Sequence, residues 1–60
     1  MTIVEAEMTS LEIANRLSDM LSALPVDAPP VARQALNEAR DALRKAADAL
    51  ADAAEGQHRG

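Results

Sequence analysis

A seven-residue repeat of leucine and alanine runs without interruption between residues 32 and 55. The two residue types alternate at steps of four and three: Ala32, Leu36, Ala39, Leu43, Ala46, Leu50 and Ala53. This spacing is typical of a helix that packs lengthwise against another helix, because such residues return to one side every two turns. Further alanines border this seam and would let a neighbouring backbone come close: Ala35, Ala42 and Ala49 on one side, Ala47 and Ala54 on the other. The chain is therefore predicted to be all-α.

The repeat predicts a helix over residues 31–55, about 38 Å long at about 1.5 Å per residue. Its composition favours a helix, since Ala, Leu, Arg, Lys, Glu and Asp dominate it. Gly56 follows the last repeat and is expected to end the helix. Residues 56–60 are then expected to form a short, polar, disordered tail that holds the single histidine, His58.

An earlier helix is predicted over residues 2–24. One side of it gathers large apolar residues at helical spacing: Ile13, Leu17, Met20, Leu21 and Leu24. Its start has two interpretations, because capping-box patterns begin at both Thr2 and Thr9. The first gives a long helix that matches the second helix in length, and we favour it. The other leaves residues 1–8 as an arm or a short strand.

The segment between the two helices, residues 25–30, contains all three prolines. Pro25 disfavours helical geometry at Leu24 and should end the first helix near there. Pro29 and Pro30 lack amide protons, which the first turn of a helix does not need. A connection of this length is common between neighbouring helices of a bundle. The chain is thus predicted to be an antiparallel two-helix hairpin that forms a single domain over residues 1–60.

A hairpin of this size is expected to need a partner. A chain of 60 residues buries a small fraction of its surface and is marginally stable alone. It has no cysteine for a disulfide or a thiolate metal site, and its 48% hydrophobic content includes 14 alanines and no aromatic residue. We therefore expect a homo-oligomer, a dimer that forms a four-helix bundle through the two predicted seams, or a complex with a larger partner protein.

Three further apolar residues lie together on the first helix, away from its main apolar side: Val4, Met8 and Leu11. They can be ordinary surface residues, part of a frayed arm, or a second stripe that contacts a partner. Contiguous exposed apolar patches often mark interaction sites, although three residues make a small patch.

The formal net charge is −4. In an antiparallel hairpin the two chain ends meet, which gathers a candidate acidic partner surface: Glu5, Glu7, Glu12, Asp48, Asp52 and Glu55. An acidic balance disfavours nucleic acid and anionic membranes as partners. No apolar run approaches the roughly 18 residues of a membrane span, and Glu5 and Glu7 stand where a secretory signal would carry basic residues. We expect a cytoplasmic protein.

No catalytic pattern is recognised in the sequence. The only histidine lies in the predicted tail, and both glycines follow residue 55, which leaves no glycine-rich phosphate loop. The inward positions of the helices are Leu and Ala, whereas a di-metal bundle needs Glu and His there. We expect no enzyme, no cofactor and no metal.

In length, helix number and Leu/Ala periodicity the chain resembles the plasmid copy-number regulator Rop, and this resemblance implies a dimer of hairpins. The favoured function is a non-enzymatic protein–protein interaction module, which could be an adaptor, a small subunit or a regulator. One alternative is an acidic inhibitor or antitoxin-like protein, of bacterial or phage origin, that binds a basic site on its target. The other is a nucleic-acid regulator that uses four basic residues of the second helix: Arg33, Arg40, Arg44 and Lys45.

Overall fold

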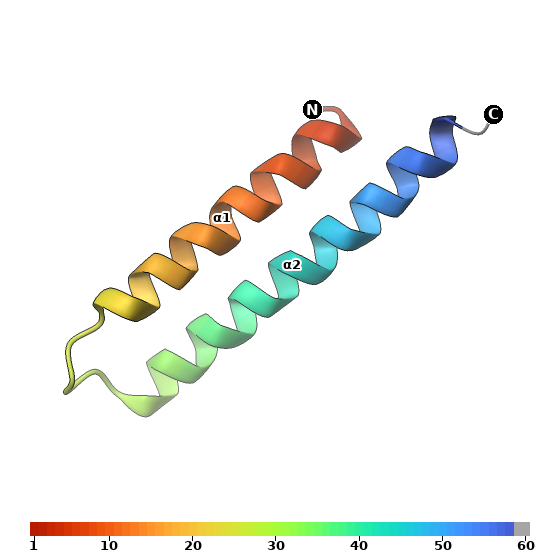
Figure 1. The fold of residues 1–60 in the computed structure, drawn as a ribbon. Helices are drawn as coiled ribbons and strands as arrows, with labels where there is room; N and C mark the ends of the chain where they lie inside the picture. The colour runs from red at the N-terminus through yellow and green to blue at the C-terminus, as the bar shows by residue number, and fades with distance from the viewer. Residues whose placement is uncertain (59–60) are drawn as a thin grey trace.

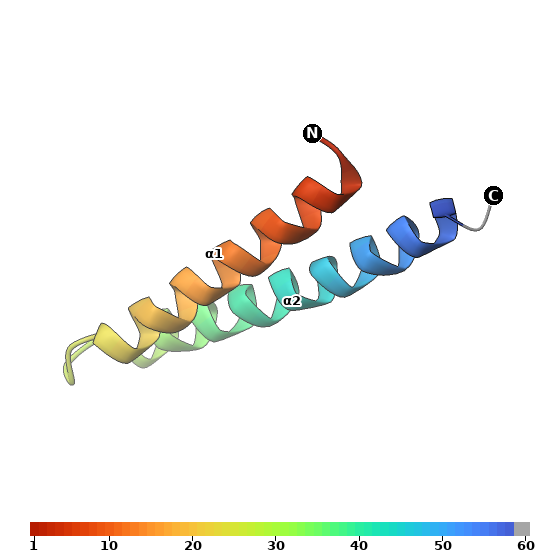
Figure 2. The same ribbon diagram turned by 45° about the horizontal axis from the view of Figure 1, so that its top comes forward.

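The protein, described by a computed structural model for residues 1–58 and for the side chains of residues 1–56, consists of two helices. Helix α1 spans Ile3–Ala23 and helix α2 spans Pro30–His58. Figures 1 and 2 show them side by side and antiparallel, with the start of α1 and the end of α2 opposite the turn. The described part of the chain holds no strand. The predicted all-helical hairpin is confirmed.

Helix α1 begins at the first of the two predicted capping boxes. The amide of Glu5 donates to the Thr2 side-chain oxygen at 3.1 Å, and the Thr2 amide donates to a Glu5 carboxylate oxygen at 3.2 Å. Two amide groups at the helix start are thus satisfied by side chains. The long helix is therefore the correct interpretation, and residues 3–8 are helical rather than an arm or a strand.

The proline-rich turn is held by backbone geometry and by one arginine. Leu24 takes an extended conformation ahead of Pro25, as the ring of a following proline favours. The carbonyl of Pro29 accepts hydrogen bonds from the amides of Ala32 and Arg33, at 3.0 and 3.2 Å, and so begins α2. The Arg33 guanidinium donates back to the Pro25 carbonyl at 3.3 Å, which ties the turn to the second helix.

Helix α2 continues beyond the predicted end at residue 55. Gly56 is helical and its φ is not positive, so the predicted end at Gly56 is wrong. One glycine costs a helix about 1 kcal/mol relative to alanine, and the strong helix formers before it outweigh this cost because helix growth is cooperative. Of the predicted tail, residues 56–58 belong to α2, and residues 59–60 lie outside the described residues.

The contact between the helices uses a different side of the leucine repeat from the predicted one. The two most buried residues are Ala14 and Ala47, which are 0% and 2% exposed. The buried or half-buried positions of α2 at steps of four and three are Leu36, Arg40, Leu43, Ala47, Leu50 and Ala54. The matching positions of α1 and of the residue that caps its end are Ile3, Glu7, Ser10, Ala14, Leu17, Leu21 and Leu24.

Six residues of the predicted seams therefore lie outside the contact within the hairpin. They are all exposed: Ile13, Met20, Ala32, Ala39, Ala46 and Ala53. The physical reason is that each leucine from position 43 onward has an alanine three and four residues later, so two sides of the stripe look alike in the sequence. Packing against α1 selects the side that carries Ala47 and Ala54.

Candidate interaction surface

The exposed part of the predicted seam forms one continuous apolar surface. Successive residues of an α-helix are rotated by about 100°, so Ile13 and Met20 lie about 100–120° to one side of Ala14. By the same geometry Ala39 and Ala46 lie about 80–100° to one side of Ala47 on α2. Because the helices are antiparallel, a rotation in the same sense along each chain appears clockwise in one helix and anticlockwise in the other when both are viewed along the hairpin. The two helices also face each other across the contact. The two displaced rows therefore fall on the same face of the molecule.

We call this surface the apolar face and define it by eight residues: Ile13, Leu17 and Met20 of α1, Leu24 just after α1, and Ala32, Ala39, Ala46 and Ala53 of α2. Ile13 is 41% exposed and Met20 is 48% exposed. Leu36, Leu43 and Leu50 are only half-buried and lie between this face and the contact with α1. The leucine side chains of α2 are thus available to α1 on one side and to a further helix on the other.

The second predicted stripe lies on the opposite face of the hairpin. Val4, Met8 and Leu11 are displaced by about 60–120° from Ala14 in the other rotational direction. They are 49%, 65% and 43% exposed. We call these three residues the Val4 stripe. It is separated from the apolar face by the contact between the helices and by the outer side of α1.

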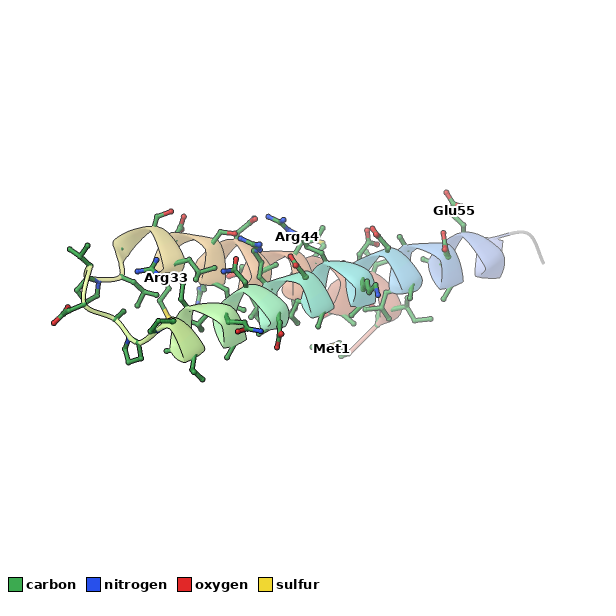
Figure 3. All side chains as sticks on the ribbon, turned by 90° about the horizontal axis from the view of Figure 1, so that it is seen from below. Met1, Arg33, Arg44 and Glu55 are labelled. Atoms are coloured by element: carbon green, nitrogen blue, oxygen red, sulfur yellow. The ribbon has the colours of Figure 1, made fainter. Side chains whose placement is uncertain are left out.

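The six predicted carboxylates lie at the open end of the hairpin, where α1 begins and α2 ends. Five of them are exposed, and the sixth, Glu7, is half-buried at a position that faces α2. Residues 3–12 and 46–56 together contain no Lys or Arg. Figure 3 shows Glu55 on the same side of α2 as Arg33 and Arg44, and positions eleven residues apart share a side of a helix. We call the open end of the hairpin, with its six carboxylates, the acidic end.

The basic residues of α2 are partly engaged in the fold. The Arg33 guanidinium holds the turn. The Arg40 side chain is 24% exposed and its Nε lies 3.3 Å from a carboxylate oxygen of Asp41. Arg44 and Lys45 are exposed but point in different directions around the helix, about 100° apart. Arg33, Arg40 and Arg44 share one side of α2, within about 40° of one another, and the first two of them are engaged within the hairpin. The nucleic-acid hypothesis stays a prediction.

An open hollow of about 520 Å³ near the turn includes Val26, Arg33 and Asn37 in its lining, and the Asn37 amide nitrogen donates to the Arg33 carbonyl at 3.1 Å. No group of three or more His, Cys, Asp or Glu side chains within the searched part of the chain is placed to hold a metal ion. Neither described helix is long and apolar enough to cross a membrane.

Comparison of the chain with protein-family models, with curated proteins and with solved structures found no match. Functional inference therefore depends on the surfaces of the hairpin itself.

Sequence periodicity found the leucines of the contact but not its polar members. Glu7, Ser10 and Ser18 of α1 and Arg40 of α2 occupy positions toward the other helix and are half-buried. The Ser10 hydroxyl donates to the Ala6 carbonyl at 2.8 Å, whereas the buried Ser18 hydroxyl has no hydrogen-bond partner. A search for apolar residues overlooks these positions. Their spacing of three or four residues from other members of the contact is the signal that could have identified them. Ser10 and Ser18 lie four residues from Ala14, Glu7 lies three from Ser10, and Arg40 lies four from Leu36.

Proposed function

We propose that this chain is a non-enzymatic protein–protein interaction module that works as a dimer. Two hairpins pack their apolar faces together and form a four-helix bundle. The bundle then acts as an adaptor, a small subunit or a regulator through its outer surface. The observation that carries this proposal is the position of the displaced apolar rows of α1 and α2 on the same face of the hairpin.

The incomplete core supports a second copy as the occupant of the apolar face. Among the described residues only Ala14 and Ala47 are buried hydrophobics, and no large apolar side chain is fully buried. In a four-helix bundle each helix contacts two neighbours and turns its apolar stripe toward the centre between them. Both helices of this hairpin have stripes displaced in that way, by similar rotations, which is the geometry that a symmetric dimer requires.

The hairpin exposes more surface than a compact monomer of its mass, as expected if part of that surface is covered in a dimer. The hairpin has an accessible surface of 4521 Å², whereas a compact monomer of its mass exposes about 3,700 Å². The excess is close to the roughly 800 Å² that each partner contributes to a standard protein–protein interface. The radius of gyration, 14.3 Å, likewise exceeds the roughly 10 Å expected for a compact domain of this length.

Charge favours an antiparallel arrangement of the two hairpins. The acidic end carries six carboxylates, one of which, Glu12, pairs with Arg16 at 3.1 Å, whereas Arg33 and Arg40 lie toward the turn. A dimer with both turns at the same end would bring the two acidic ends together, and like charges at an interface are unfavourable. Packing them in opposite directions separates the acidic ends and places each beside the turn half of the other copy.

The direct test is the association constant of the wild-type chain and of the double variant Ile13→Gln/Met20→Gln, measured by sedimentation equilibrium. We expect a wild-type dimer. The variant should associate about tenfold more weakly or worse, because two side chains that would be buried in the dimer become polar. Helicity recorded on the same samples shows whether dissociated chains still fold.

Val31→Gln provides the matched control, because Val31 is 78% exposed and lies about 160° from Ala47, on the outer side of α2 and about 60–80° from Ala39 and Ala46. This variant should associate like the wild type. A wild-type chain that stays monomeric and fully helical at high concentration would contradict the proposal. Equal association of the wild type and the double variant would show that the apolar face is not the interface.

A further inference from the structure

The Val4 stripe remains uncovered in the proposed dimer, because it lies on the face opposite the one that the second hairpin occupies. Its three large side chains are exposed by 43–65%. Their spacing of four and three residues places them in a row of about 10 Å along α1. A row of this length matches two turns of an apposed helix, whose anchors recur at the same spacing.

The charges around the stripe indicate the chemistry of its partner. Glu5 and Glu12 border it on the outer side of α1 and both are exposed; Glu5 accepts a hydrogen bond from the Thr2 amide, and Glu12 pairs with Arg16 at 3.1 Å. On α2 the exposed carboxylates of Asp48 and Glu55 lie about 80–100° from Ala47 in the rotational direction that reaches the same face. Along residues 3–12 and 46–56 the stripe is therefore an apolar row between two acidic borders, and the exposed Arg44, on the same side of α2 as Glu55, lies beyond them toward the turn.

A second copy of the chain does not fit this surface, because both copies would bring acidic borders to the contact. An anionic lipid surface is repelled for the same reason. A helix with an apolar row and basic residues on both sides of that row can cover the stripe and pair with the carboxylates that border it.

We propose that the Val4 stripe docks an amphipathic helix with basic borders from a partner protein. This inference rests on the proposed interaction function and adds to it a separate binding surface with a stated kind of partner. The apolar row supplies the burial, and the carboxylates orient the partner helix and speed its association at low salt.

The test uses the full-length chain and a synthetic peptide of about 14 residues, with leucines at helical positions i, i+3, i+4 and i+7 and lysines elsewhere. Titration calorimetry measures its binding to the wild type and to Met8→Gln/Leu11→Gln. Both residues are exposed, and glutamine is a good helix former, so the variant should keep its helicity and its dimer. Its affinity for the peptide should fall by about tenfold or more.

Three controls distinguish docking at the Val4 stripe from non-specific peptide binding and from the proposed dimerisation. A peptide with the same composition but a permuted order, and one with glutamate in place of lysine, should bind more weakly by about tenfold or more. Ile13→Gln/Met20→Gln should bind the lysine peptide like the wild type, even where its dimer is weakened. Asp48→Asn/Asp52→Asn/Glu55→Gln should bind more weakly at about 50 mM salt and depend less on salt than the wild type.

Several results would overturn the docking site. Unchanged peptide binding by Met8→Gln/Leu11→Gln, or equal binding of the glutamate peptide, would show that neither the stripe nor its charge recognises the helix. Loss of the dimer in Met8→Gln/Leu11→Gln would show that the stripe is a contact between copies. A monomeric wild type that still binds the lysine peptide through Met8 and Leu11 would contradict the proposed dimer and leave the docking site supported.

Discussion

Single polar residues determine how well the two helices fit together. The contact contains Ser18, whose buried hydroxyl makes no hydrogen bond, and Ser10, whose hydroxyl bonds the Ala6 carbonyl one turn earlier. A buried polar group without a partner costs about 1–3 kcal/mol. The Ser10 hydroxyl is therefore satisfied by a hydrogen bond, whereas the Ser18 hydroxyl is not.

This contrast leads to a prediction for Ser18→Ala. The substitution removes the unpaired hydroxyl and introduces a better helix former, so the free energy of unfolding should rise by about 1 kcal/mol or more. Ser10→Ala is the matched control, because it also gains helix propensity but loses a hydrogen bond. Urea unfolding followed by circular dichroism measures both. A destabilised Ser18→Ala chain would mean that this hydroxyl is satisfied in solution.

At the level of the helices, alanine sets how closely α1 and α2 approach. Ala14 and Ala47 are the two most buried residues, and each stands where a larger side chain would push the neighbouring backbone away. The alanines on the other sides of α2 have no such neighbour within the hairpin. The same residue type thus has a packing role at one position of the repeat and an open surface at another.

Replacing Ala47 with Leu should therefore destabilise the protein. An extra large side chain in a packed contact costs about 1–3 kcal/mol. Ala49→Leu, two residues away and exposed, should change the free energy of unfolding by no more than about 0.5 kcal/mol. Denaturant unfolding of both variants at one protein concentration makes the comparison. Equal effects at the two positions would contradict the observed orientation of α2.

For the molecule as a whole, stability and association should be coupled. The hairpin is 52 Å long and only 15 × 14 Å across, so every large side chain is near the surface. If most of the burial is completed by a second copy, folding and dimerisation share the same free energy. Stability then depends on the amount of protein present.

We accordingly expect Tm to rise with protein concentration. Each tenfold increase favours the associated state by about 1.4 kcal/mol, which should raise Tm by several degrees in a protein of this size. Thermal unfolding followed by circular dichroism over about a hundredfold range of concentration tests this. The double variant Ile13→Gln/Met20→Gln should show a smaller dependence. A Tm that is independent of concentration would indicate a hairpin that is stable by itself.

Local interactions explain why much of the fold follows from the sequence alone. The Thr2–Glu5 capping box, the break at Pro25 and the start of α2 at Pro30 depend on residues a few positions apart. The Glu12–Arg16 ion pair, at 3.1 Å, is likewise one helical turn long. Helical periodicity also assigned the leucines at 36, 43 and 50 to an apolar side of α2, because that assignment requires only the spacing of residues along one helix.

Tertiary packing decided what periodicity leaves open. A stripe with alanines on both sides of its leucines can meet α1 through either side, and only the docked helices show that Ala47 faces α1 while Ala39 and Ala46 face outward. The orientation of α1 likewise places Ile13 and Met20 on one side of the helix contact and the Val4 stripe on the other. The cause is that a sequence specifies the width of an apolar stripe, whereas the fit of side chains between two helices specifies which part of that stripe is buried.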